Sequence, residues 1–169
     1  MVIHQKIGNL EAYNINDKAI DWLALEWYET RKRILHKRTI SERGIILKFL
    51  QENPALTEGD VLFEDETSII AIQILPCDAI VIQPINMFEM ASVCYEIGNK
   101  HLPLFYENDT VLVPFDAPLF RLLVAQGYNV TQARKKLVQP LKTSVLPHSN
   151  TGASESLFSK IMKLTSPNG

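Results

Sequence analysis

Apolar side chains recur in short, interrupted runs over the first 74 residues of the chain. The runs VIHQKIGNL, DWLALEWYETRKRIL and RGIILKFL are rich in aromatic and β-branched residues, which are typical of strands. Between Asp21 and Trp27, most apolar side chains, namely those of Trp22, Leu23, Leu25 and Trp27, lie at alternate positions. This pattern predicts a strand with one buried face and places both tryptophans in the core.

A hairpin is predicted next, in the segment GDVLFEDETSIIAIQIL. Gly59 and Asp60 form a turn signal at its start, and the polar residues 64–67 are suited to the tip between two strands. Together with the preceding runs, this hairpin predicts a small all-β domain over residues 1–74.

The period of the pattern changes after Pro76. AIVIQP (79–84) predicts a short strand, and NMFEMASVCYEIGNK (86–100) repeats apolar residues at helical spacing. Asn86 is suited to the N-cap position of this helix. Gly98 is suited to the left-handed conformation that ends a helix.

Two strands, a second helix and a last strand follow. HLPLFYE and TVLVPF flank a turn at residues 108–109, APLFRLLVAQG predicts a helix from Asp116 to Gly127, and YNVTQARKKLV is extended. The order βαββαβ is that of a ferredoxin-like domain, in which two helices cover one face of an antiparallel sheet.

The whole chain is therefore predicted to be an α+β protein with three parts. A β-rich domain covers residues 1–74, and a ferredoxin-like domain covers residues 75–145 with the boundary at Leu75-Pro76. Residues 146–169 are rich in Ser, Thr, Asn and Gly, which predicts a flexible C-terminal tail.

Composition excludes several classes of partner. The 169 residues are 46% hydrophobic, and the 17 Lys and Arg nearly balance the 19 Asp and Glu, so no overall charge attracts nucleic acid or a membrane surface. No apolar run approaches the roughly 18 residues of a membrane span, and the first residues do not follow the plan of a signal peptide. We expect a globular protein of the cytoplasm.

The sequence also lacks the usual signatures of catalysis. It contains no GxSxG elbow, HExxH pair, P-loop or GxGxxG, so we expect no enzyme activity. Cys77 and Cys94 stand 17 residues apart, which fits neither a disulfide framework nor a zinc ribbon. Both are expected to be small buried thiols.

The run RKRILHKR (31–38) has two interpretations. Six of its eight side chains are cationic or can become so, and such a run can hold a phosphate or an acidic protein. A strand with one solvated face has the same pattern, and Glu26 and Glu29 lie close enough in sequence to offset the charge.

The four histidines differ in context. His4 and His36 lie within strand patterns, whereas His101 follows a predicted helix end and His148 stands in the tail. One imidazole does not make a metal site, so the residues alone leave His101 open as either a surface side chain or a ligand.

The stretch YEIGNKH, which ends at His101, resembles the helix end of the UreE family of urease accessory metallochaperones, whose motif is usually Gly-Asn-Arg-His. Three further stretches are similar to that family in the correct order: DWLALEWYETRKRIL to an early strand, LTEGDVLFED to a hairpin, and VLVPFDAPL with LLVAQG to the region after the metal-site loop. The resemblance covers residues 1–148.

This resemblance implies a homodimer of chains, each with a β-rich peptide-binding domain and a ferredoxin-like domain, that carries Ni²⁺ at its interface. We expect Zn²⁺ as a second ion that the protein binds. The resemblance also implies delivery of nickel, together with an accessory GTPase, to apo-urease. His101 matches the family's interfacial metal ligand, and His148 falls where relatives carry a C-terminal histidine. The chain departs from the family at Lys100, which replaces the usual arginine, and it lacks the histidine-rich tail of many relatives.

A two-fold axis explains how one histidine can suffice. Identical residues of two chains meet at such an axis, so both copies of His101 can share one ion, and His148 can add to them. The alternative is a peptide-binding or protein-docking module that uses the β domain and the basic run, with metal incidental. Dependence of metal binding on His101 distinguishes the two.

Overall fold

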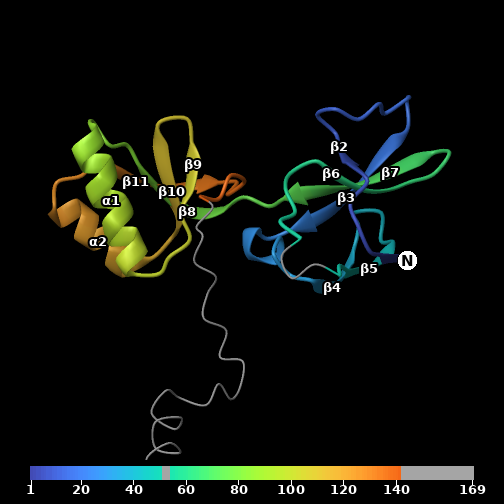
Figure 1. Ribbon diagram of the computed structural model, residues 1–169, viewed down its shortest axis with the longest axis horizontal. Coiled ribbons are helices and arrows are strands. Elements are labelled where there is room, and N and C mark those ends of the chain that lie inside the picture. Colours follow the sequence, from blue (N-terminus) through green and yellow to red (C-terminus); the bar gives the residue numbers. More distant parts are fainter. Residues whose placement is uncertain (51–53, 142–169) are drawn as a thin grey trace, which may run out of the picture.

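The computed structural model describes residues 1–50 and 54–141 and shows two groups of elements, each with its own core (Figure 1). The first group contains eight short elements: β1 (Val2–Ile3), β2 (Gly8–Asn9), β3 (Ala19–Leu25), the 3-10 turn η1 (Trp27–Glu29), β4 (Ile34–Arg38), β5 (Gly44–Lys48), β6 (Asp60–Glu64) and β7 (Ser68–Ile74). They form a three-stranded sheet of order β1-β5-β4 and a four-stranded sheet of order β2-β6-β7-β3.

The core of the first group lies between these two sheets. Leu23 and Leu25 of β3 are fully buried beside Ile45 and Leu47 of β5. Because side chains alternate along a strand, one face of each sheet supplies this core and the opposite face is left for other contacts.

The alternation predicted around Trp22 is only partly correct. Leu23 and Leu25 share the buried face, but Trp22 packs on the other face of the sheet, where it contacts a separate small cluster around Val61. Trp27 lies beyond the end of β3, in η1. Both tryptophans are partly buried, and neither belongs to the main core.

The second group is a ferredoxin-like unit, as predicted. Its elements are β8 (Cys77–Ile82), α1 (Met87–Asn99), β9 (Phe105–Glu107), β10 (Thr110–Pro114), α2 (Ala117–Ala125) and β11 (Val130–Lys135). The sheet has the order β11-β8-β10-β9 with every neighbouring pair antiparallel. The α+β fold class is therefore confirmed.

The two faces of this sheet have different roles. Both helices lie on one face, where Ile80 and Ile82 of β8 pack with Val93 and Leu119 (Figure 1). Val81 points to the other face, into a cluster that also receives Trp27 from the first group.

Contacts between the two groups are few and mixed in character. The ring of Trp27 meets that of Phe105 edge to face, with centroids 5.7 Å apart. Lys136 forms an ion pair with Glu58 at 2.7 Å, and Val138 packs against the core of the first group. The division at residues 74 and 75 stays a prediction, and the predicted tail 146–169 lies outside the described residues.

The β6–β7 hairpin tip is held by one carboxylate. Oδ1 of Asp65 accepts hydrogen bonds from the backbone N–H of Thr67 at 2.9 Å and of Ser68 at 2.7 Å. These two bonds stabilise the charged form, so the pKa of Asp65 is lowered to about 2. The polar tip predicted at residues 64–67 is therefore a turn in which the Asp65 side chain accepts the backbone hydrogen bonds.

We predict that Asp65→Asn lowers stability at neutral pH and that its effect fades in acid. A carboxyl whose pKa is lowered by folding stabilises the native state above its unfolded pKa, and this contribution is lost as the pH falls toward about 2. Urea unfolding followed by tryptophan fluorescence at several pH values measures the difference. A difference that stays constant from neutral pH to pH ~2 contradicts the assignment.

Candidate metal centre at the end of helix α1

Helix α1 is fixed at its start by a side-chain cap. The Asn86 side chain accepts a hydrogen bond from the Glu89 N–H at 2.9 Å, as the sequence predicts, and the Glu89 carboxylate accepts from the Ile85 N–H at 2.9 Å. Val93 and Ile97 are buried against the sheet. The helix therefore has a defined start and a defined face toward the core.

The end of α1 is a Schellman turn with a histidine at its left-handed position. The N–H of His101 donates to the Gly98 carbonyl at 2.9 Å, and the N–H of Leu102 donates to the Ile97 carbonyl at 3.3 Å. His101 has φ 54°, in the left-handed region that favours glycine. The prediction that Gly98 ends the helix is wrong, because Gly98 lies within α1.

The burial of Leu102, five positions after Ile97, explains where the helix stops. Leu102 is partly buried against the cluster that contains Ile97, and this contact typically accompanies a Schellman turn. It fixes the turn one residue before Leu102, so His101 takes the left-handed conformation although it is not glycine. The spacing of Ile97 and Leu102 is the signal in the sequence that could have located this turn.

The imidazole of His101 is exposed on this fixed backbone. A left-handed conformation is uncommon for residues other than glycine, although histidine is among those that adopt it more often. Backbone strain of this kind concentrates at functional sites, where the surrounding structure maintains it. His101 is one of six non-glycine residues with positive φ in the described chain, so this conformation fixes where its imidazole projects and does not by itself identify a ligand.

The last described residues run beside the loop that follows His101. The N–H of Tyr106 donates to the Gln139 carbonyl at 3.0 Å, and the N–H of Leu141 donates to the Leu104 carbonyl at 2.8 Å. Leu141 thus lies opposite a residue three positions after His101. The chain continues from this point toward His148, which itself lies outside the described residues.

The two other histidines of the described chain, His4 and His36, belong to the first group of elements and are far from His101 in the sequence. His4 is exposed and its Nδ1 is 3.0 Å from the Lys48 carbonyl oxygen, and His36 is exposed on β4. Within residues 1–50 and 54–141, no three His, Cys, Asp or Glu side chains gather closely enough to hold a metal ion. A single copy of the described chain therefore brings no three-ligand metal site together at His101.

The cysteines are poor candidates as ligands. Both are free thiols and partly buried, whereas the sequence predicts buried thiols. Burial raises the pKa of Cys94. Burial also raises the pKa of Cys77, and the negative charges of Glu26 and Asp78 add a smaller increase. Because the thiolate is the form that binds metal, both side chains are held in the less reactive state near neutral pH.

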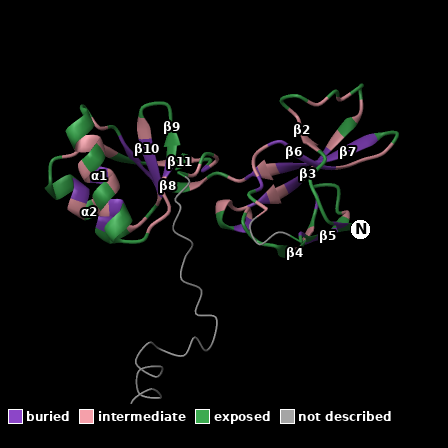
Figure 2. Cartoon of the chain, viewed as in Figure 1, coloured by how far each residue is buried: buried purple, intermediate pink, exposed green. Residues whose placement is uncertain are grey.

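Helix α1 also carries an uncovered apolar stripe that leads to His101. Met87, Phe88 and Tyr95 are 82%, 81% and 69% exposed, and Ala91 before Tyr95 and Gly98 after it are also exposed. Phe88, Ala91, Tyr95 and Gly98 recur at spacings of three and four, so they lie along one side of the helix, with Met87 beside Phe88 at its start. Figure 2 shows exposed residues along α1. Exposed apolar surface of this kind commonly marks a protein interface.

Comparison with known proteins identifies relatives over nearly the whole chain. Residues 3–75 match the family model described as UreE urease accessory protein, N-terminal domain, and residues 78–153 match that of the C-terminal domain. A urease accessory protein UreE of Flavobacterium johnsoniae is 42% identical over 164 residues, covering 97% of this chain and 99% of the relative. Proteins of the same description from Haemophilus influenzae and Acetivibrio thermocellus are 41% and 37% identical, covering 85% and 83% of this chain and 80% and 92% of the relatives.

We predict opposite effects of two substitutions at position 101. His101→Gly should preserve the free energy of unfolding or raise it by up to about 1 kcal/mol, because glycine adopts positive φ without steric cost. His101→Val should lower it by about 1–2 kcal/mol, because a β-branched side chain is strained there. Chemical unfolding followed by far-UV circular dichroism compares them. Equal stability of both variants contradicts a left-handed residue 101.

Proposed function

The chain belongs to the UreE family of urease accessory proteins, and from this premise we propose that it is a homodimeric chaperone that carries Ni²⁺ to apo-urease during urease maturation. The family is one of accessory chaperones and not of enzymes. Nickel is then the cargo of the protein, and the question for the structure is which residues would hold it.

The observation that carries the proposal is the position of His101 at the end of an uncovered apolar stripe. The stripe, formed by Met87, Phe88, Ala91, Tyr95 and Gly98, ends three residues before the exposed His101. Covering this stripe with a second copy of itself removes apolar surface from water, which is the main driving force for association. The same pairing would bring two His101 residues toward one axis.

Sharing a site across a two-fold axis fits the donor set of the chain. A single copy offers one imidazole at this position, which is too few ligands for useful nickel affinity, whereas a dimer doubles every ligand. Neutral imidazoles with open positions hold the ion less firmly than a closed set of thiolates. Such a site suits a protein that must later release its metal.

His148 is proposed as an additional ligand. Leu141 lies beside Leu104, and seven residues of extended chain reach at most about 25 Å. Leu104 lies three positions after His101, a span of at most about 11 Å. This length is enough for His148 to reach an ion at His101 of its own chain. The same imidazole set also accepts Zn²⁺, which shares a preference for nitrogen ligands.

The remaining parts of the proposal concern partners and place. We propose that the dimer works with the urease accessory GTPase and the apo-urease complex in the cytoplasm, with residues 1–74 and 75–145 as its two domains and 146–169 as a tail. No nucleic acid or membrane is involved in this scheme. No helix within residues 1–50 and 54–141 has the length and apolar character needed to cross a membrane.

We predict that tight nickel binding saturates near one ion per dimer and depends on His101. His101→Ala removes both central imidazoles and should lower the affinity at least about a hundredfold, as loss of the main ligands of a site does. His148→Ala should cost less, because ordering the tail opposes the gain from its ligand. Isothermal titration at neutral pH measures both effects, and affinity should fall on acidification because protons compete with the metal for imidazole.

His4→Ala and His36→Ala are matched controls for this titration. Each removes one exposed imidazole from the first group of strands. Both should bind nickel like the native protein and keep the same stoichiometry. An His101→Ala protein with unchanged nickel binding rules out the shared site and favours a docking module in which metal is incidental.

We predict that the protein is a dimer without metal and that the stripe on α1 holds it together. Phe88→Glu places a charge on the paired surface without disturbing the core, because the side chain is 81% exposed. Light scattering at micromolar concentration with a chelator present should give a dimer for the native chain and a monomer for this variant. Leu50→Glu, at a side chain 85% exposed in the first group, is the control and should remain dimeric. A native monomer contradicts the proposal.

A further inference from the structure

The last described residues, 136–141, lie between the two groups of elements and contact both. Figure 1 shows this end of the described chain on the side of the second group that faces the first. Lys136 reaches Glu58 at 2.7 Å, and Val138 packs against the first core. Leu137, the residue between them, is buried in the cluster on the helix-free face of the second sheet. We call residues 136–141 the strap.

The second half of the strap pairs with β9, beside the loop that follows His101. Pro140 lies opposite Phe105, and the N–H of Leu141 donates to the Leu104 carbonyl at 2.8 Å. Successive residues of one short segment therefore contact the first core, the helix-free face of the second sheet and the loop next to the candidate ligand.

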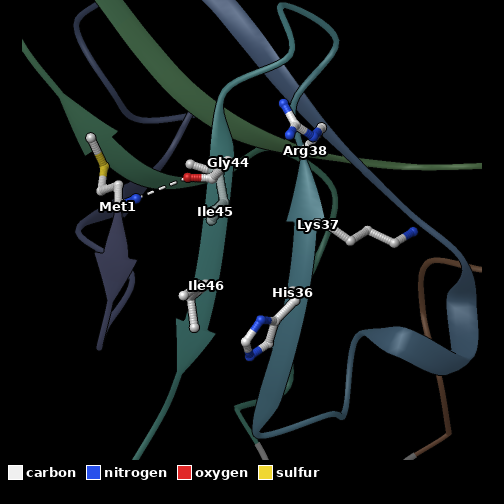
Figure 3. A pocket seen from close by; sticks show the side chains of 7 residues that line it. All are labelled: Met1, His36, Lys37, Arg38, Gly44, Ile45 and Ile46. Carbon is white, nitrogen blue, oxygen red and sulfur yellow. Dashed lines mark hydrogen bonds between the residues drawn. The ribbon is translucent and has the colours of Figure 1, made fainter.

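Trp27 packs against the cluster that holds the strap, and its own position is fixed within the first group. The 3-10 turn η1 that carries Trp27 is anchored by Lys37, whose Nζ donates to the Glu29 carboxylate at 2.5 Å and to the Ala24 carbonyl at 3.1 Å. Figure 3 shows that the Lys37 side chain projects from β4 on the side opposite to His36. The Glu29 carboxylate also accepts a backbone N–H at the start of the turn at 2.9 Å. The indole therefore leaves the second group only when the two groups separate.

The contact between the two groups is weak enough to open. Its main parts among the described residues are one edge-to-face aromatic pair, one half-buried valine and one ion pair whose side chains are 40% and 32% exposed. Single aromatic contacts and partly exposed ion pairs each stabilise little. Each group has its own core, so the two groups can separate while both stay folded.

We propose that the strap and Trp27 form a latch between the two groups, and that closure of this latch and binding of nickel through His148 favour each other. The latch itself stands on the contacts of the metal-free chain, whereas its link to nickel rests on the proposed function. The device makes the relative position of the two groups depend on whether the metal is bound.

The link follows from where the strap ends. With the latch closed, Leu141 lies beside Leu104, so the chain leaves for His148 from a point close to His101. Opening removes the contacts that the strap makes with the first group, and its remaining hold on β9 is weaker. A ligand that starts farther from the ion has a lower effective concentration there, so opening disfavours its binding. By linkage, an ion held through that ligand favours the closed latch to the same extent.

Trypsin cleavage after Lys136, identified by the mass of the fragments, measures opening of the latch in the metal-free full chain. A backbone segment that is packed on both groups resists cleavage, and the rate follows the fraction of chains in which it is detached. Val138→Asp places a charge against the first core and should raise this rate at least about fivefold, and Trp27→Ala should do the same. Val124→Asp, at a valine 51% exposed on α2, is the matched control and should be cleaved like the native chain.

The same cleavage in saturating Ni²⁺ measures the link between the latch and the metal. Nickel should slow cleavage of the native chain after Lys136 at least about fivefold, because an ion that prefers the closed latch lowers the open fraction. In His148→Ala, nickel held at His101 should give no such protection, while the metal-free rate should equal that of the native chain. This variant also shows whether nickel acts on trypsin itself.

Three results would overturn the inference. Equal metal-free rates for the native chain, Val138→Asp and Trp27→Ala would exclude the latch, and so would a Val124→Asp chain cleaved as fast as Val138→Asp. Equal protection by nickel in the native chain and His148→Ala would exclude the link to the metal. A chain that binds no nickel contradicts the proposed function and the link together, and the metal-free rates then decide on the latch alone. Unchanged cleavage within β5 distinguishes release of the strap from unfolding of the first group.

Discussion

The packing of Leu102 against the cluster that contains Ile97 is the constraint on which the end of helix α1 depends. It closes α1 with two backbone hydrogen bonds and reverses the direction of the chain within a few residues. The reversal leaves His101 exposed on a backbone with little freedom and delivers Phe105 to the start of β9. Phe105 in turn meets Trp27 of the first group. One local closure therefore positions the candidate ligand, an edge strand and part of the contact between the two groups.

Signals confined to a few residues were enough to predict much of the fold. Asn86 and Asp116 cap the two helices through their side chains, and Gly127 ends the second helix at φ 82°. Each of these residues acts on backbone groups within four positions of itself, so no knowledge of distant contacts is needed. The βαββαβ order follows from the resulting element boundaries, and this order gave the correct fold for the second group.

The predictions that failed depend on contacts between distant parts of the chain. Gly98 has the chemistry of a helix stop, but burial of Leu102 with Ile97 moves the stop to His101. Trp27 fits an alternating strand pattern, yet its ring packs against Phe105, 78 positions away in sequence. The resemblance of YEIGNKH to a family motif was enough to predict a candidate site at His101. The left-handed conformation of His101 and the position of residues 139–141 beside the following loop depend on tertiary structure.

The segment at residues 139–141 also affects how this protein behaves at high concentration. It lies antiparallel along β9, the last strand of its sheet among the described residues, with Pro140 opposite Phe105. The flanking hydrogen bonds, from Tyr106 to Gln139 and from Leu141 to Leu104, show that the nitrogen of Pro140 faces away from β9. A proline nitrogen carries no hydrogen, so the outer side of this segment offers no donor at its centre. A strand from another molecule therefore finds an incomplete template there, and the sheet is protected against growth into an aggregate.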